Sequence, residues 1–180
     1  RNFPEHQSVE MDLETQKSES IKIFYAGLFG VAQGVLELCE KIDLKGLNIE
    51  LHLFGDGAEK TAIEAFISSN TDRKIFFHGM LERNVLHEKL KSFDIAIVPL
   101  KTRIYGSVPS KIFEYSALGF PILYFGGGEG ENIVNENKLG WVCPVENYND
   151  LNEKLVELSN VTKTEIHSIK QAIFKKSHEV

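Results

Sequence analysis

The sequence predicts an α/β domain with a doubly wound, Rossmann-like parallel sheet of about six strands and helices on both faces. Short apolar runs alternate about six times with segments of helical periodicity, and the connections are short. This alternation is typical of a parallel sheet covered by helices. The runs are almost continuously apolar, as strands buried on both faces must be. Glycines follow most of the runs, where a strand would pass into a helix.

The apolar runs define the expected strands. Each run contains β-branched or aromatic residues and has glycine or proline at or near its end, which is a strand signature. In chain order the expected strands are residues 21–27, 49–57, 74–79, 94–100, 121–128 and 140–145.

The segments between the runs carry apolar residues at helical spacing. Residues 35–42 illustrate the pattern, because their apolar side chains recur along one face. The helix expected at residues 110–119 ends at Gly119, a common helix terminator. The other expected helices are residues 58–69, 82–93, 131–140, 148–159 and 163–177.

The 180 residues are enough for one domain with a core of its own. Residues 1–20 are polar and lack periodicity, so we interpret them as an interdomain linker or arm. Residues 21–180 would form the folded domain. Because the chain begins inside this linker, we expect it to be part of a longer protein with a preceding N-terminal domain.

The composition excludes several classes of function. The net charge is -6, whereas a sequence-independent nucleic-acid binder carries a surplus of Lys and Arg. No apolar run reaches membrane-spanning length and no signal peptide is visible. Cys39 and Cys143 lack partners at metal-ligand spacing, so we expect buried thiols in a cytoplasmic protein without a metal. We expect His78 to be a satisfied surface or core residue, and the other histidines to share no site.

Ligands of open parallel sheets bind beyond the carboxyl ends of the strands. The glycines expected at this edge are Gly27, Gly30, Gly55, Gly57, Gly79 and Gly126 to Gly128. Glycine allows a ligand to approach the backbone, and helix N-termini favour phosphate; each cluster is equally compatible with a tight turn and no ligand. No complete GxGxxG or GxxxxGK[ST] pattern is present, which argues against a simple NAD enzyme and a phosphate-loop NTPase.

The helix at residues 110–119 carries the most specific signal. Ser110 is the expected cap, after Pro109. Lys111 lies in the first turn, where the helix dipole disfavours a cation unless an anion binds there. Glu114 lies about one turn deeper, roughly 5.4 Å along the axis, a spacing that suits a diphosphate at the helix mouth and its ribose at the carboxylate. An exposed Lys111–Glu114 ion pair is the equally acceptable alternative.

Several segments together resemble a known family. They are "YAGLFGVAQGVLELCEKI", "IELHLFGDGAEK", "IFFHGML" and, most specifically, "VPSKIFEYSALGFPIL". Nearly the whole chain is similar to the C-terminal, nucleotide-sugar-binding domain of family 4 retaining glycosyltransferases, which is one half of the GT-B fold. The similarity is strongest to the branch that makes bacterial surface polysaccharides, and "RNFPE" resembles the linker between the two GT-B domains.

The resemblance implies a hexosyl- or N-acetylhexosaminyltransferase. A sugar would pass from a nucleoside diphosphate donor, which we expect to be UDP-linked, to a glycan or lipid-linked acceptor held by the N-terminal domain. The anomeric configuration would be retained, and neither a metal nor a cofactor is implied. The isolated domain would then be inactive. Lys170, Lys175 and Lys176 leave a peripheral association with the inner face of the cell membrane open, although we expect a solvated helix face.

The family's ribose-binding glutamate corresponds to Glu114. The glutamate eight positions earlier, which contacts the donor sugar in the family, corresponds to Gly106 here. Two basic residues that hold the diphosphate correspond to Leu28 and Gln33. These departures imply either a rearranged phosphate site or a weakened donor site. We expect the first, because Ser110 and Lys111 place a cation where the helix dipole favours an anion.

Lys111 is the first candidate to compensate for the missing cations and to stabilise the leaving diphosphate, followed by Arg103 and Lys101. The expected donor-binding residues are Gly27, Gly30, Gly55, Gly79, Met80, Arg103, Ser110, Lys111 and Glu114.

Two alternatives remain. A sugar-nucleotide epimerase of the GT-B type shares this architecture. A flavodoxin-like or receiver-like module belongs to another class, but a receiver requires an acidic cluster after its first strand, and "GLFGVAQG" contains no acid.

Overall fold

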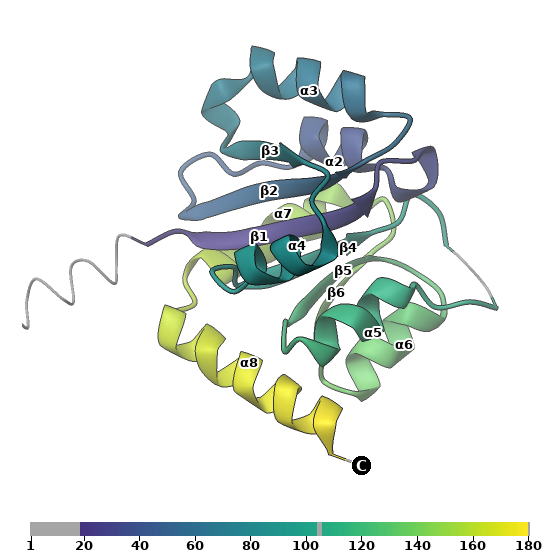
Figure 1. The fold of residues 1–180 in the computed structure, drawn as a ribbon, viewed down its shortest axis with the longest axis vertical. Coiled ribbons are helices and arrows are strands. Elements are labelled where there is room, and N and C mark those ends of the chain that lie inside the picture. Colours follow the sequence, from purple (N-terminus) through teal and green to yellow (C-terminus); the bar gives the residue numbers. More distant parts are fainter. Residues whose placement is uncertain (1–18, 104–105, 180) are drawn as a thin grey trace, which may run out of the picture.

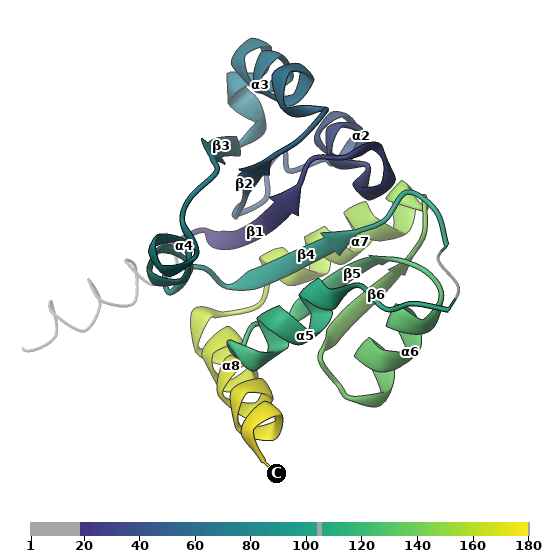
Figure 2. The same ribbon diagram turned by 45° about the vertical axis from the view of Figure 1, so that its right-hand side comes forward.

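The computed structural model describes residues 19–103 and 106–179. Six strands form one all-parallel sheet in the order β3-β2-β1-β4-β5-β6 (Figures 1 and 2). Every predicted strand is confirmed, with ends that differ from the prediction by at most two residues. The strands are β1 (Ile21–Leu28), β2 (Ile49–Asp56), β3 (Ile75–Gly79), β4 (Ile95–Pro99), β5 (Ile122–Gly126) and β6 (Gly140–Pro144).

Helices cover both faces of the sheet, as predicted (Figure 2). One buried cluster joins the sheet to α2, α3 and α7, and a second joins its other face to α4, α5 and α6. The helices are η1 (Val31–Gln33), α2 (Val35–Lys41), α3 (Lys60–Ser69), η2 (Thr71–Arg73), α4 (Arg83–Leu90), α5 (Ser110–Ala117), α6 (Glu129–Glu136), α7 (Tyr148–Ser159) and α8 (Lys163–His178). The alternating strands and helices thus form the predicted doubly wound fold.

Helix α6 differs most from its predicted range of residues 131–140. It ends at Glu136, and the side-chain amide of Asn137 donates to the Ile133 carbonyl. Lys138 then adopts a left-handed conformation with φ of 52°. A Cβ at Gly140 would lie 2.0 Å from the Ile122 carbonyl oxygen. The chain must therefore leave the helix before Gly140, because β6 begins to pair with β5 at this residue, and the close approach there requires glycine.

The sheet reverses its winding direction between β1 and β4. From β1 the chain builds β2 and β3 on one side, and then β4, β5 and β6 on the other. β1 pairs with β2 along its whole length, whereas it pairs with β4 only at Ile23–Ile95 and Phe24–Ala96. Such a reversal leaves a crevice at the carboxyl ends of the central strands, where α/β proteins bind ligands.

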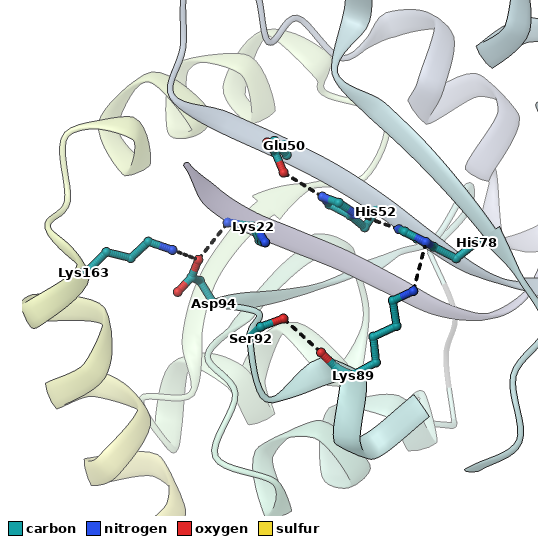
Figure 3. A network of polar contacts seen from close by, with 8 residues as sticks. All are labelled: Lys22, Glu50, His52, His78, Lys89, Ser92, Asp94 and Lys163. Carbon is teal, nitrogen blue, oxygen red and sulfur yellow. Dashed lines mark hydrogen bonds and ion pairs between the residues drawn. The ribbon is translucent and has the colours of Figure 1, made fainter. Parts of the chain in front are cut away.

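Helix α8 is attached to the sheet by polar contacts (Figure 3). The Asp94 carboxylate accepts from the Lys163 ammonium at 2.5 Å and from the Lys22 backbone N–H at 2.8 Å. Lys170 donates to the Phe93 carbonyl at 2.7 Å, and burial lowers its pKa. The expectation of a solvated helix face is therefore wrong for Lys170, because its ammonium is bonded to the segment that precedes β4.

The two cysteines are buried, free thiols, as expected. Burial raises the pKa of Cys39 to about 12 and that of Cys143 to about 11, so both are unreactive at neutral pH. Among the described residues, no helix is both long and apolar enough to cross a bilayer.

Candidate functional site

A pocket of about 530 Å³ opens at the carboxyl ends of β1 and β2, between them and the first turn of α5. Its volume is typical of small-molecule sites, which span about 300–1,000 Å³. The described residues that line it are Ala26, Gly27, Leu28, Phe54, Gly55, Asp56, Gly57, Met80, Leu81, Leu86 and Lys111. The pocket thus lies at the edge of the sheet that the sequence predicts for a ligand.

The backbone of the pocket depends on glycine where β1 and β2 end. Gly27 and Gly55 are paired in register. A Cβ at Gly55 would lie 1.8 Å from the Gly27 carbonyl oxygen, and the φ of Gly55 is 144°. A side chain at this position would clash with β1, so close approach of the two strand ends requires glycine.

One part of the wall is apolar. Phe54, Leu81 and Leu86 line it from β2, from the segment after β3 and from α4. Leu28 and Met80 also line the pocket and are 60% and 74% exposed. These surfaces suit the flat face of a base or another apolar group. The sequence reasoning did not select Phe54, Leu81 or Leu86, because their spacing also fits ordinary core residues.

Among the described lining residues, Lys111 is the one cation and Asp56 the one carboxylate. The Asp56 carboxylate accepts from the Gly57 backbone N–H at 2.8 Å. The Lys111 ammonium lies 3.3 Å from Glu114 Oε2 and 5.5 Å from the centre of the Tyr115 ring. The cation is thus held at the first turn of α5, next to the end of β1.

Glu114 lies one turn deeper on α5, behind Lys111 rather than in the pocket wall. Both members of the pair are partly buried, with side chains 35% exposed for Lys111 and 30% for Glu114. Glu114 Oε1 lies 4.0 Å from His87 Nε2 on α4. The ion pair foreseen as an alternative is therefore present, but it adjoins the pocket and differs from an exposed surface pair.

The prediction that Ser110 caps α5 is wrong. Pro109 occupies the cap position, with φ of -56° and ψ of 124°, and Ser110 is the first helical residue. No side chain accepts a hydrogen bond from the backbone at this helix start. The proline ring fixes φ near the value that the cap position requires. Its side chain has no hydrogen-bond acceptor, so the first backbone N–H groups of α5 have no side-chain partner.

The structure brings together Gly27, Gly55, Met80 and Lys111, which line one pocket. The other predicted residues lie outside this lining. Gly79, with φ of 74°, immediately precedes Met80 at the end of β3. Gly30 caps η1, and Ser110 and Glu114 lie on α5 to either side of Lys111.

Arg103 takes part in a different cluster. It forms an ion pair with Glu131 at 3.0 Å, and a Cβ at Gly127 would lie 2.7 Å from its Nε. Arg103 therefore lies across the start of α6. Lys101 is 3.9 Å from Glu37 on α2. Both weaker cation candidates are thus already paired with carboxylates outside the pocket.

The three positions that depart from the family pattern have distinct surroundings. Leu28 lines the pocket and is mostly exposed. Gln33 has a buried Oε1 without a hydrogen-bond partner among the described residues. Gly106 has φ of 76°, a left-handed conformation that glycine adopts more readily than other residues.

A chain of polar contacts lies beside the pocket, on β2, β3 and α4 (Figure 3). Lys89 Nζ is 3.5 Å from His78 Nδ1, His78 Nε2 is 2.7 Å from His52 Nδ1, and His52 Nε2 is 2.8 Å from Glu50 Oε2. All contacts are satisfied if each residue donates to the next and both imidazoles are neutral. Burial, together with Lys89 and His52, lowers the pKa of His78 to about 4.

These contacts decide the expectations for the histidines. His78 is a satisfied residue, as predicted. The expectation that the others share no site concerned His6, which lies outside the described residues, and His52, His87, His167 and His178. None of the contacts among the described residues joins two of them. His52 instead contacts His78, and His87 faces Glu114. Their positions along the sequence gave no signal, because the contacts depend on strand pairing and helix docking. No cluster of metal-binding side chains occurs within residues 19–103 and 106–179.

Comparisons with known proteins point to the family that the sequence resembles. Residues 20–160 match the family model described as Glycosyl transferases group 1. Over 158 residues the chain is 23% identical to the probable glycosyltransferase WbjE of Pseudomonas aeruginosa, an alignment that covers 86% of this chain and 40% of that protein. The chain therefore spans less than half the length of this curated relative.

Two solved structures share the fold. The C-terminal domain of LpcC, a glycosyl transferase group 1 family protein from Francisella tularensis, has a TM-score of 0.66 at 17% identity, covering 92% of this chain and 89% of that chain. Alr3699/HepE of Anabaena, in complex with UDP and glucose, has a TM-score of 0.71 at 11% identity, covering 94% and 46%. The architecture is thus that of one half of a GT-B glycosyltransferase.

Proposed function

The chain belongs to the group 1 glycosyl transferases, and from this premise we propose that it is the donor-binding half of a retaining enzyme. The enzyme transfers a hexosyl or N-acetylhexosaminyl group from a nucleoside diphosphate sugar to a glycan or lipid-linked acceptor. One observation carries the proposal: Lys111 lines the pocket at the first turn of α5, and Glu114 lies one turn deeper, 3.3 Å from the lysine. A cation at the mouth of the helix thus adjoins a carboxylate, and these are the two groups that we assign to the diphosphate and to the ribose.

We place the donor in the pocket in one direction. The base lies against the apolar wall of Phe54, Leu81 and Leu86, and the diphosphate lies at Lys111 and the backbone of Gly27. We place the ribose between them, next to Glu114. Because Glu114 lies behind Lys111 and outside the pocket lining, its carboxylate must turn toward the pocket, where it can accept both hydroxyl hydrogens. We favour UDP, the nucleotide in the Anabaena complex of similar fold.

Lys111 has a defined role in this reaction. As the bond between the anomeric carbon and the phosphate oxygen breaks, its electron pair passes to the diphosphate. The acceptor hydroxyl oxygen forms the new bond to the anomeric carbon and loses its proton. Lys111 and the free N–H groups at the start of α5 stabilise the charge that develops on the leaving group. We place the acceptor site, and the group that takes the acceptor's proton, in the N-terminal domain that we propose to precede this one.

Residues 1–18, the main part of the proposed linker, lie outside the described residues. The buried thiols of Cys39 and Cys143 support our placement of the enzyme in the cytoplasm.

Titration calorimetry with UDP, GDP and FMN tests the proposal. We expect UDP to bind with micromolar affinity and FMN not to bind. Preferential binding of GDP would change the base assignment only. Binding of FMN without either nucleotide would support the flavodoxin-like alternative and overturn the proposal.

A further inference from the structure

His87 presents an unused hydrogen-bonding nitrogen to Glu114. It lies on α4, directly after Leu86, which lines the pocket. Its Nε2 is buried and has no hydrogen-bond partner among the described residues. The nearest carboxylate oxygen is Glu114 Oε1, at 4.0 Å. Buried polar atoms in proteins are nearly always paired, so this nitrogen requires an explanation.

The gap between the two side chains is small. A nitrogen–oxygen hydrogen bond spans about 2.7–3.2 Å, so the 4.0 Å separation closes with a shift of about 1 Å. The Glu114 side chain is 30% exposed and can rotate by that amount. In the structure, Lys111 holds the other carboxylate oxygen at 3.3 Å. The carboxylate therefore lies between two nitrogen donors on different helices.

Donor binding would change the balance between these partners. This step rests on the proposed function, in which Lys111 contacts the diphosphate and Glu114 the ribose. Lys111 lines the pocket, so an incoming diphosphate competes with Glu114 for its ammonium. Once Lys111 has turned to the diphosphate, the partly exposed Glu114 carboxylate would have no fixed orientation beside the ribose. It needs a second donor to keep its orientation.

We propose that His87 is the positioning residue for Glu114: its Nε2–H donates to Glu114 Oε1 in the nucleotide-bound protein and orients the carboxylate toward the ribose hydroxyls. A carboxylate has lone pairs for all these partners, because each oxygen accepts two hydrogen bonds. His87 does not touch the donor. It acts through Glu114, and its effect is specific to ligands with both ribose hydroxyls.

The test compares UDP with 2′-deoxy-UDP in the same calorimetric titration. The ratio of their dissociation constants measures the contact between Glu114 and the ribose. His87→Leu removes the nitrogen donor, and His87→Met is a second apolar variant in case the first folds poorly. His87→Gln is the matched control, because its amide can place an N–H near the position of Nε2. Glu114→Gln reports the ratio when the charged acceptor is removed. Thermal unfolding checks that each variant is folded.

We expect His87→Leu to weaken UDP binding about tenfold, the effect of losing one hydrogen bond to a charged group. Binding of 2′-deoxy-UDP should change by less than about twofold, and His87→Gln should keep the wild-type ratio. An unchanged ratio in folded His87→Leu and His87→Met would overturn the inference, as would a loss in His87→Gln equal to that in His87→Leu.

The outcomes separate this inference from the proposed function. If Glu114→Gln abolishes the ratio while both apolar variants of His87 retain it, the proposed function stands and the role of His87 is rejected. If the wild-type protein binds neither nucleotide, both the proposed function and the role of His87 are rejected.

Discussion

The imidazole of His78 stacks on the ring of Phe54, with ring centroids 4.5 Å apart and planes 11° from parallel. Phe54 lines the pocket, and His78 is bonded to His52. The wall against which we place the base is therefore backed by a pair of neutral histidines.

Acid should destabilise the protein through this histidine pair. The folded-state pKa of His78 is lowered from 6.5 to about 4, and that of His52 is also lowered, in both cases mainly by burial. The unfolded chain therefore binds more protons in this range. The contribution of the pair to stability is complete above pH 6.5 and is lost as the pH falls from about 6.5 to about 4. Urea denaturation at several pH values measures this loss.

His78→Gln provides the control for the acid experiment. Glutamine can still donate to His52 but does not titrate, so the pH dependence between 6.5 and 4 should flatten. An equally steep dependence in this variant would assign the acid sensitivity to other groups.

Lys111→Met should weaken UDP binding about ten- to a hundredfold, because a hydrogen bond to a charged group contributes about 1.5–3 kcal/mol. Methionine keeps an unbranched apolar side chain against Gly27 and Tyr115 and removes only the charge. Lys101→Met is the matched control, since Lys101 pairs with Glu37 and lies outside the pocket lining. Calorimetry should show near-wild-type affinity for the control. Equal losses in both variants would point to a general charge effect.

Glu114→Gln should lower UDP affinity about tenfold through loss of the ribose contact. Binding of inorganic diphosphate should not weaken, because the variant also removes the carboxylate that competes for the Lys111 ammonium. Glu131→Gln changes the partner of Arg103 in the neighbouring cluster and serves as control. A larger loss of UDP affinity in Glu131→Gln than in Glu114→Gln would indicate that the ribose binds at the start of α6 instead.

Gly55→Ala should destabilise the protein by about 3 kcal/mol or more, since the added methyl would clash with the Gly27 carbonyl in a conformation that alanine disfavours. Gly46→Ala is a suitable control. Its φ is also positive, at 73°, but nothing lies within 4 Å of the added Cβ, so only the backbone cost of about 1 kcal/mol remains. Chemical denaturation compares the two. Equal losses of unfolding free energy in the two variants would show that the close approach of β1 and β2 adds nothing to the cost of Gly55→Ala.

The chain as it stands should bind UDP but not transfer sugar from a UDP-sugar to a glycan acceptor, because the proposed acceptor domain is absent. A radiolabelled transfer assay checks this. Turnover by this chain alone would show that the donor-binding half carries the catalytic group and an acceptor site.

Most of the fold could be predicted because its signals are local. A continuous apolar run such as residues 94–100 indicates a buried strand, and alternation with helices indicates a parallel sheet. The end of α6 could not be predicted, because the chain must leave the helix before Gly140 pairs with Ile122 on another strand. Helical periodicity continues beyond the position where the sheet requires the helix to stop.

The candidate site was partly predictable for the same reason. The edge of the sheet follows from the topology, and Gly27 and Lys111 follow from their place at that edge. Leu86 and His87 could not be found, because their roles depend on how α4 docks on the sheet. In sequence, Leu86 looks like any core residue, and His87 has no neighbour that marks it as functional.

The narrow pairing between β1 and β4 has a mechanical consequence. Gly27 lies at the end of β1 and Lys111 on α5, and among the described residues the strand pairing between β1 and β4 is limited to two residue pairs. A nucleotide bound by both residues would link the two halves of the sheet across the boundary between β1 and β4. Local unfolding of either half of the sheet, β1–β3 or β4–β6, would release the nucleotide. The bound nucleotide should therefore make the two halves unfold as one unit.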